Sequence, residues 1–274
     1  MRRTNHLRST RQSWAGAMRP KILFCLACLV LAVTTPALAQ SGTAERGEAD
    51  EAEALTNLGF THAKSGQHTK AVEALKQAVR LNPGSAESHY LLGAAYNNVG
   101  LHREAIVAFQ EAVRLRPAWG EAYSGLGVAY NCAGRFEESL KALRQAIRLA
   151  PGWAQAYVNL SATYTNLRRF REAAEASEQA IRLDPGLAEA HYRLGRAYCL
   201  LGRRGEAAES LRRAISLRPD YAEAHSDLGA VYLLLGNRAA ALEEHRKVQA
   251  LNPGLAGELF RAIHKDKILT LSRQ

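Results

Sequence analysis

The chain has 274 residues and a formal net charge of +10, a value that by itself suggests nucleic-acid binding. Six of the Lys and Arg residues fall in residues 1–39, and without that segment 30 basic residues stand against 26 acidic ones, a net charge of +4. That balance is ordinary for a soluble domain, so we expect no nucleic-acid partner.

Residues 1–39 show the three features of a signal peptide in their usual order. Basic residues without any acidic one are followed by an apolar run, Ile22–Val33, and then by small residues at Ala37 and Ala39. We therefore expect cleavage between Ala39 and Gln40 and export to the bacterial periplasm or out of the cell. After cleavage we expect no contact with the membrane.

Two alternatives for this leader stay open. The apolar run has 12 residues, whereas a membrane span takes roughly 20; an uncleaved leader would nevertheless anchor the protein in the inner membrane. Met18 is a second possible start, because the residues that follow it form a complete signal peptide by themselves. The next segment, 40–51, is small and acidic without apolar periodicity, and we expect a flexible linker there.

From residue 52 onward the chain repeats itself every 34 residues. Six of its eight prolines fall at this interval, at Pro83, Pro117, Pro151, Pro185, Pro219 and Pro253. A fixed period of this length indicates an array of one small structural unit. Six units follow without insertion, over 52–85, 86–119, 120–153, 154–187, 188–221 and 222–255.

Each unit reads as two helices joined by a turn. Five of the six turns carry Gly, which enters the left-handed backbone region without steric cost, whereas Arg168 stands there in the fourth unit and predicts a less relaxed turn. Large apolar residues recur at spacings of three and four and share one helical face, which only a stacked neighbour can bury.

One unit illustrates the resemblance that these positions carry. Leu92, Gly93 and Tyr96, then Ala105, Phe109 and Ala112, then Pro117, recur together at the 34-residue period. In these positions the chain resembles the tetratricopeptide repeat family over Ala52–Leu255. Ser139 and Ser177 depart from the pattern at apolar or Ala sites and are expected to soften the packing locally.

The resemblance implies an all-α fold, a right-handed α-solenoid of six helix-turn-helix repeats. It also implies that the first helices line a concave face that holds a peptide or another protein. Solenoids need caps over their terminal units. We expect residues 256–274 to form a C-terminal capping helix and tail, with Leu259, Phe260, Ile263 and Leu269 on one face.

The sequence from residue 40 onward holds no recognisable catalytic, cofactor-binding or metal-binding motif, so we expect no enzyme activity, no cofactor and no metal. His89, His191 and His225 share one position in their units, and a spacing of roughly 10 Å between neighbouring units keeps them from sharing a metal ion. We interpret them as inward-facing, hydrogen-bonded histidines. Cys132 and Cys199 lie two units apart and are expected to be free thiols.

Some first-helix residues escape the core pattern and are expected to line the groove. Asn has both a donor and an acceptor and can pair with the backbone of an extended peptide, while Tyr adds apolar area with a polar tip. The predicted groove residues are Tyr90, Asn97, Asn98, Ser124, Asn131, Val158, Asn166, Tyr192 and Arg196.

The sequence therefore predicts a non-enzymatic scaffold that binds a protein or an extended peptide in an envelope or periplasmic complex. Two alternatives remain. The chain is either an accessory or substrate-presenting subunit of an enzyme whose catalytic part is another chain, or a self-associating structural array, that is, a homo-oligomer.

Overall fold

The computed structural model describes residues 47–271, with side chains up to residue 263. The leader, its predicted cleavage site and Met18 lie outside the described residues. The chain divides into two units, Met1–Asp50 and Glu51–Gln274. In the first unit residues 47–50 are helical, and the second unit is an α-solenoid whose described elements are helices and turns, with no strand among them.

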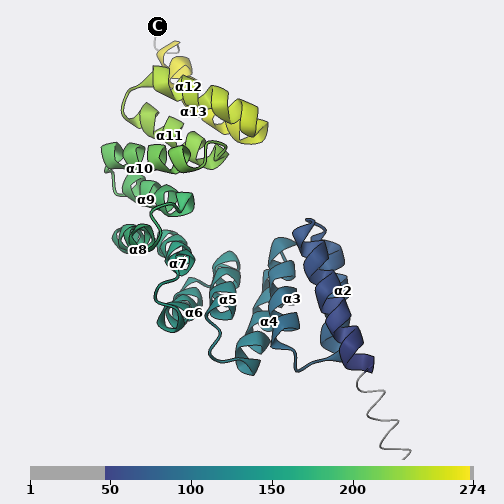
Figure 1. Ribbon diagram of the computed structural model, residues 1–274. Helices are drawn as coiled ribbons and strands as arrows, with labels where there is room; N and C mark the ends of the chain where they lie inside the picture. Colours follow the sequence, from purple (N-terminus) through teal and green to yellow (C-terminus); the bar gives the residue numbers. More distant parts are fainter. Residues whose placement is uncertain (1–46, 272–274) are drawn as a thin grey trace, which may run out of the picture. The chain divides into compact units, whose positions relative to one another are not determined.

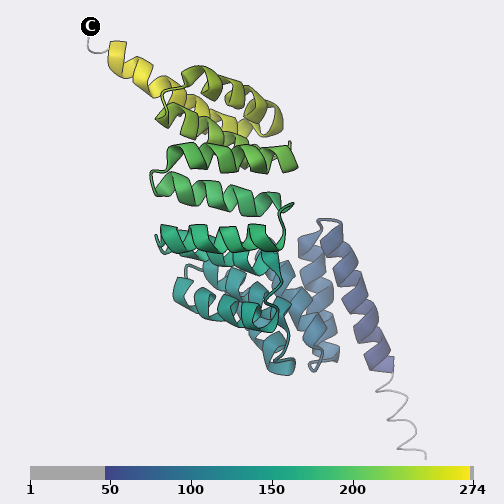
Figure 2. The same cartoon turned by 60° about the vertical axis from the view of Figure 1, so that its left-hand side comes forward.

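The helices follow one another side by side in chain order (Figures 1 and 2). Residues 51–64 are the first helix of the first repeat and pair with α2. The later helices are α2 (His68–Leu81), α3 (Ala86–Asn98), α4 (His102–Leu115), α5 (Gly120–Cys132), α6 (Phe136–Leu149), α7 (Ala154–Asn166), α8 (Phe170–Leu183), α9 (Ala188–Leu200), α10 (Arg204–Leu217), α11 (Ala222–Leu234), α12 (Arg238–Leu251) and α13 (Pro253–Leu271). The predicted right-handed solenoid of six helix pairs is confirmed.

The helix over residues 47–64 begins earlier than expected. Residues 47–51 are helical, although the sequence predicted a flexible linker over 40–51. Their three carboxylates, those of Glu48, Asp50 and Glu51, lie in the first turns, where they complement the positive end of the helix dipole. The lack of apolar periodicity in residues 47–51 therefore reflects an exposed start of the helix rather than an irregular segment.

The turns and corners follow from two residue types. The five turn glycines have φ between 72° and 80°, and Arg168 takes the same left-handed conformation with φ of 59°. This conformation costs a residue with a side chain about 1–2 kcal/mol, so the less relaxed turn of the fourth repeat is confirmed. Before each proline the backbone leaves the helix, with ψ between 74° and 93°, as expected from the clash between a proline ring and the preceding residue.

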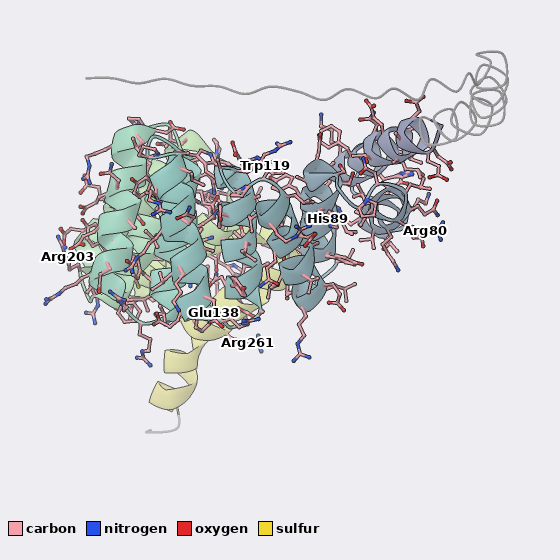
Figure 3. All side chains as sticks on the ribbon, turned by 90° about the horizontal axis from the view of Figure 1, so that it is seen from below. Arg80, His89, Trp119, Glu138, Arg203 and Arg261 are labelled. Atoms are coloured by element: carbon pink, nitrogen blue, oxygen red, sulfur yellow. The ribbon has the colours of Figure 1, made fainter. Side chains whose placement is uncertain are left out.

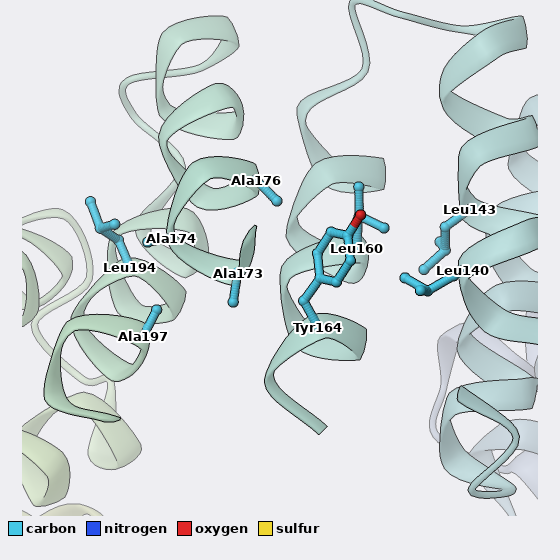
Figure 4. Packing of buried hydrophobic residues seen from close by; sticks show 9 residues of the cluster. All are labelled: Leu140, Leu143, Leu160, Tyr164, Ala173, Ala174, Ala176, Leu194 and Ala197. Carbon is cyan, nitrogen blue, oxygen red and sulfur yellow. The ribbon is translucent and has the colours of Figure 1, made fainter. Parts of the chain in front are cut away.

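In the first, second, third and fifth repeats the two helices touch through a glycine of the first helix. A Cβ on Gly127 would lie 2.6 Å from Cγ of Leu143, and a Cβ on Gly195 would lie 2.7 Å from Cγ of Leu211. Side chains of neighbouring repeats fill the rest of the core. Figure 4 shows Leu160 of α7 among buried residues of α6 and α8, in one continuous cluster.

In the fourth repeat the two helices make the same contact through different residues. Ser161 replaces the glycine and Ser177 replaces the large apolar residue, so both partners are small. Their hydroxyl oxygens are 2.7 Å apart, and each also lies within hydrogen-bond distance of the Ala173 carbonyl. The departure of Ser177 from the repeat pattern is thus accompanied by hydrogen bonds of its buried hydroxyl, which the sequence did not predict.

Ser139 is a second buried serine whose hydroxyl has hydrogen-bond partners. Its hydroxyl donates to the Gly127 carbonyl at 2.7 Å and lies 2.9 Å from the hydroxyl of Thr163, which belongs to the next repeat. Buried hydroxyls are costly only when they lack partners, so this one links two repeats at no such cost.

The three aligned histidines join each repeat to the proline corner before it. Nε2 of His89 lies 3.1 Å from the Pro83 carbonyl, and His191 repeats this contact at 3.1 Å. His225 makes it at 3.0 Å, and its Nδ1 lies 2.5 Å from the buried carboxylate of Glu244. The interpretation of these residues as hydrogen-bonded histidines is confirmed.

The C-terminal helix caps the last repeat and starts earlier than predicted. Pro253 itself opens α13, a position that suits a residue without an N–H. Leu259 and Ile263 are buried, and a Cβ on Gly229 would lie 2.7 Å from Leu259, which thus takes the place of the second-helix leucine of other repeats. Phe260 is 48% exposed, so its predicted position on the buried face was wrong.

None of the helices in residues 47–271 is long and apolar enough to cross a membrane.

Candidate functional site

A hollow of about 410 Å³ lies on the first-helix face where α3 meets α5. We call it the open hollow. Four of the predicted groove residues line it, namely Tyr90, Asn97, Asn98 and Ser124. The other lining residues are Ala94, Phe109, Glu121, Gly125, Val128, Cys132, Trp153 and Asn159. The structure thus brings together the three predicted groove residues of the second repeat and Ser124 of the third.

An aromatic wall forms one side of the open hollow. The Tyr90 ring packs edge-on against Phe109 at a centroid distance of 5.7 Å and lies 4.7 Å from Trp119. Trp119 is in the loop between α4 and α5 (Figure 3), and the Arg116 guanidinium stacks on it at 4.4 Å. Burial raises the pKa of Tyr90, and the nearby Glu121 carboxylate raises it further, so the phenol stays neutral.

The open hollow depends on a glycine that is not part of the repeat pattern. A Cβ on Gly125 would lie 2.5 Å from Cε1 of Phe109, which is closer than a side chain tolerates. Phe109 belongs to the second helix of the preceding repeat and is only 2% exposed. Gly125 therefore lets a buried ring form the floor of the hollow.

Two amides on the polar side are held by neighbours. Asn159 donates to the Ser124 hydroxyl at 3.0 Å, which fixes both side chains. The side-chain amide oxygen of Asn97, Oδ1, lies 3.1 Å from Nδ1 of His102. Asn98, at the end of α3, is exposed. The hollow therefore presents ordered amide groups beside aromatic rings.

Other predicted groove residues lie elsewhere. Asn166 donates to Asn131 at 2.9 Å across two repeats, and this exposed pair does not line the open hollow. The assignment of Val158 to the groove was wrong, because its side chain is fully buried with Ala180 and Ala190. In α7 this position faces the next repeat rather than the groove.

Arg196 lines a second, smaller hollow of about 180 Å³ where α9 meets α11, and Tyr192 lies beside Arg196. We call it the filled hollow. It is lined by Arg196, Cys199, Leu200, Leu211, Asp227 and Ala230. Tyr192 is 8% exposed and packs on Tyr221 at 4.9 Å, so it is a buried neighbour of the hollow rather than an exposed groove contact.

Sequence reasoning missed several lining residues. Trp153 ends the third unit, and Trp119 holds the same position in the second, just before a first helix begins. Two tryptophans at one repeat position outside the core pattern were the available signal. Gly125 and Asn159 share another position, and their variation between repeats gave no indication of which one mattered.

The two cysteines among the described residues are free, Cys132 exposed and Cys199 half-buried, as expected. Burial raises the pKa of both thiols, and Asp227 raises that of Cys199 further. Both are therefore protonated and weakly nucleophilic at neutral pH. Among the residues that the structure describes, no three or more His, Cys, Asp and Glu residues lie where they could hold a metal ion.

The comparisons agree with this architecture. The family model described as the Cilia and flagella-associated protein 70 C-terminal domain matches residues 8–260, most of the chain. The search of the curated proteins gave no match.

Solved structures show the same fold at low sequence identity. The crystal structure of the APC/C hetero-tetramer Cut9-Hcn1 has a TM-score of 0.70 and 18% identity; the match covers 84% of this chain and 46% of that chain, so this chain spans less than half its length. PilW, titled a widely conserved type IV pilus biogenesis factor, has a TM-score of 0.66 and 20% identity, and the match covers 74% of this chain and 94% of PilW. YrrB, titled a TPR protein with an unusual peptide-binding site, has a TM-score of 0.50 and 22% identity, with 69% and 99% covered.

The 34-residue helix pairs, their glycine contacts and proline corners, and the matching family model together lead to one conclusion: the chain belongs to the tetratricopeptide repeat family.

Proposed function

We propose that this protein is a non-enzymatic scaffold that binds an extended peptide or protein segment along its first-helix face, with the open hollow as the main contact. The observation that carries the proposal is the hollow itself, which combines aromatic rings and ordered amides at predicted groove positions. Family membership supports a protein-interaction scaffold in general.

The chemistry of the open hollow suits an extended chain. An Asn amide both donates and accepts, so Asn97, Asn98 and Asn159 can pair with peptide N–H and C=O groups whatever the side chains are. Tyr90 and Trp153 offer rigid apolar area at low entropic cost. Together these groups would hold backbone and one side chain of the partner.

The leader supports a place for this scaffold in the envelope. Residues 1–39 carry the signal-peptide pattern, and we propose export with cleavage before Gln40. Amino-terminal sequencing of the protein isolated from a bacterial host tests this. A terminus at Gln40 supports export, whereas a terminus at Met1 or Met18 would mean a retained leader.

The binding proposal is tested by selecting random twelve-residue peptides on the full chain and measuring their affinity for groove variants. We expect the triple change Asn97→Ala, Asn98→Ala and Asn159→Ala to weaken the selected peptides at least tenfold. The matched control is Asn131→Ala with Asn166→Ala, which removes an exposed asparagine pair outside the hollow.

Equal weakening by both sets, with helicity unchanged by circular dichroism, would remove the open hollow as the binding site. Light scattering on the same samples tests self-association. End-to-end stacking needs an uncovered terminal core, and α13 covers that of the last repeat.

A further inference from the structure

The two hollows occupy equivalent positions three repeats apart. Every residue that lines the filled hollow has a counterpart lining the open one: Arg196 corresponds to Ala94, Cys199 to Asn97, Leu200 to Asn98, Leu211 to Phe109, Asp227 to Gly125 and Ala230 to Val128. The solenoid therefore contains the same site twice, with different side chains in it.

In the filled hollow a basic side chain of the protein occupies the site. Nε of Arg196 lies 3.6 Å from a carboxylate oxygen of Asp227, and its guanidinium carbon lies 5.8 Å from the centroid of the Tyr192 ring. An arginine beside an aromatic ring and a carboxylate is a favourable combination.

In the open hollow the same aromatic wall is present without the arginine. Tyr90 takes the place of Tyr192 and Trp119 that of Tyr221, at similar ring distances of 4.7 Å and 4.9 Å. Ala94 stands where Arg196 would be, and Gly125 stands where Asp227 would be. The volume is correspondingly about 410 Å³ instead of about 180 Å³.

The charges around the open hollow favour a cation. Glu121 supplies the one carboxylate among the residues that line it, and no Lys or Arg is among them. Arg116 is stacked against Trp119, which does not line the hollow itself. The carbonyl oxygens of Asn97 and Asn98 add neutral acceptors for N–H groups.

We propose that the open hollow binds an arginine side chain of the partner peptide, in the place that Arg196 occupies in the filled hollow. The guanidinium lies beside the Tyr90 ring, with Glu121 as its carboxylate partner and the asparagine carbonyls as further acceptors. This inference rests on the proposed function, because the arginine belongs to a peptide held along the first-helix face.

The test uses the peptides selected on the full chain. We expect them to share an arginine, and replacing that arginine by citrulline, which keeps the shape and loses the charge, to weaken binding about tenfold or more. Replacement by lysine should weaken it less than citrulline does, because the charge is kept while the planar fork is lost.

A variant that supplies its own arginine should compete with the peptide. Ala94→Arg is expected to weaken the arginine peptide at least tenfold. The matched control is Ala162→Arg, the same helix position in the fourth repeat and outside the hollow, which should leave the affinity within twofold. Circular dichroism verifies that both variants keep their helices.

The reciprocal variant empties the filled hollow. Arg196→Ala with Asp227→Gly should create a second site, so that titration calorimetry finds two arginine peptides per chain instead of one. A folded double variant that still binds one peptide contradicts the equivalence of the two hollows.

The outcomes separate the two proposals. Peptides that lose affinity with Ala94→Arg but contain no common arginine, or tolerate citrulline, overturn the arginine site and leave the peptide groove in place. Selection that yields no peptide with affinity for the first-helix face overturns the groove, and the arginine site with it.

Discussion

The open and filled hollows lie at equivalent places in the repeat but differ at all six paired lining positions, and an arginine of the protein stands in only one of them. The supporting core is nearly the same, with Leu92, Gly93 and Tyr96 at one site repeated as Leu194, Gly195 and Tyr198 at the other. The main difference is the exchange of Ala94 and Gly125 for Arg196 and Asp227. In this solenoid the repeat sets the positions of the lining residues, and the exchanges at Ala94 and Gly125 are the ones that change the charge of the hollow.

Repeat four, which links the two sites, shows that such exchanges occur in matched pairs. Its Ser161 and Ser177 replace a glycine and a large apolar residue together, and the contact is kept by a hydrogen bond. An unmatched change at either kind of site should therefore cost more than a matched one.

The floor of the open hollow should be the most sensitive point. Phe109→Ala removes a fully enclosed ring and is expected to lower the free energy of unfolding by about 3–5 kcal/mol, measured by urea denaturation. Phe109→Leu reproduces the residue found at Leu211 and should cost less than about 1.5 kcal/mol. Equal losses for both would show that the two floors are not equivalent.

In the fourth repeat, Ser177→Leu should lower the free energy of unfolding when it is made alone, and lower it much less when it is combined with Ser161→Gly. Alone, it places a leucine against the Cβ of Ser161 and should cost about 1–3 kcal/mol. Adding Ser161→Gly, which restores the arrangement of the other repeats, should recover most of the lost stability. A double-mutant cycle measures the coupling, and additive effects would refute pairwise matching.

The turn of the same repeat should gain stability when it is made like the other five. Arg168→Gly relieves the left-handed strain at φ of 59° and should raise stability by about 1 kcal/mol or less, since glycine also loosens the unfolded chain. The measurement is the thermal midpoint, with Arg171→Gly in the helix as a control that should lower it. A loss with Arg168→Gly would mean that the arginine side chain contributes more than the strain costs.

Removing the ion pair of the filled hollow should change the stability of the protein least, and this change should depend on pH. Burial raises the pKa of the Asp227 carboxyl more than Arg196 lowers it, so the folded protein binds that proton more readily than the unfolded chain. The stability that the protonated Asp227 carboxyl contributes is therefore present at low pH. It is lost as pH rises from about 3.9, the ordinary carboxyl pKa.

Asp227→Asn should accordingly match the wild type below that pH and be slightly more stable at pH 7. The margin is small because the Asp227 side chain is 37% exposed. Unfolding midpoints of both proteins over this pH range check the sign, and a variant less stable at pH 7 would mean that the ion pair outweighs the burial.

The fold could be predicted from the sequence because its determinants are local and repeated. Each proline forces the preceding residue out of the helix, and each turn glycine or Arg168 takes the left-handed conformation, so the period fixed the helices. Errors arose where the period stops: α13 begins at Pro253 and not after it, and the helix over 47–64 extends into the expected linker.

The candidate site could be predicted only in part. Helical spacing placed Tyr90, Asn97 and Ser124 on one face, and the structure brings them into one hollow. Spacing could not show that Val158 turns into the core or that Arg196 meets Asp227, because both depend on the neighbouring repeat. Trp153 reaches the hollow from a corner that carries no helical period.

Each hollow is lined by one free cysteine, and this allows a direct test. Cys132 lines the open hollow and Cys199 the filled one. Alkylation rates of the two thiols, followed by mass spectrometry of the full chain with and without a saturating selected peptide, compare the sites in one sample. The account predicts that the peptide slows alkylation of Cys132 severalfold and leaves Cys199 unchanged; protection of Cys199 alone, or of both thiols equally, would contradict it.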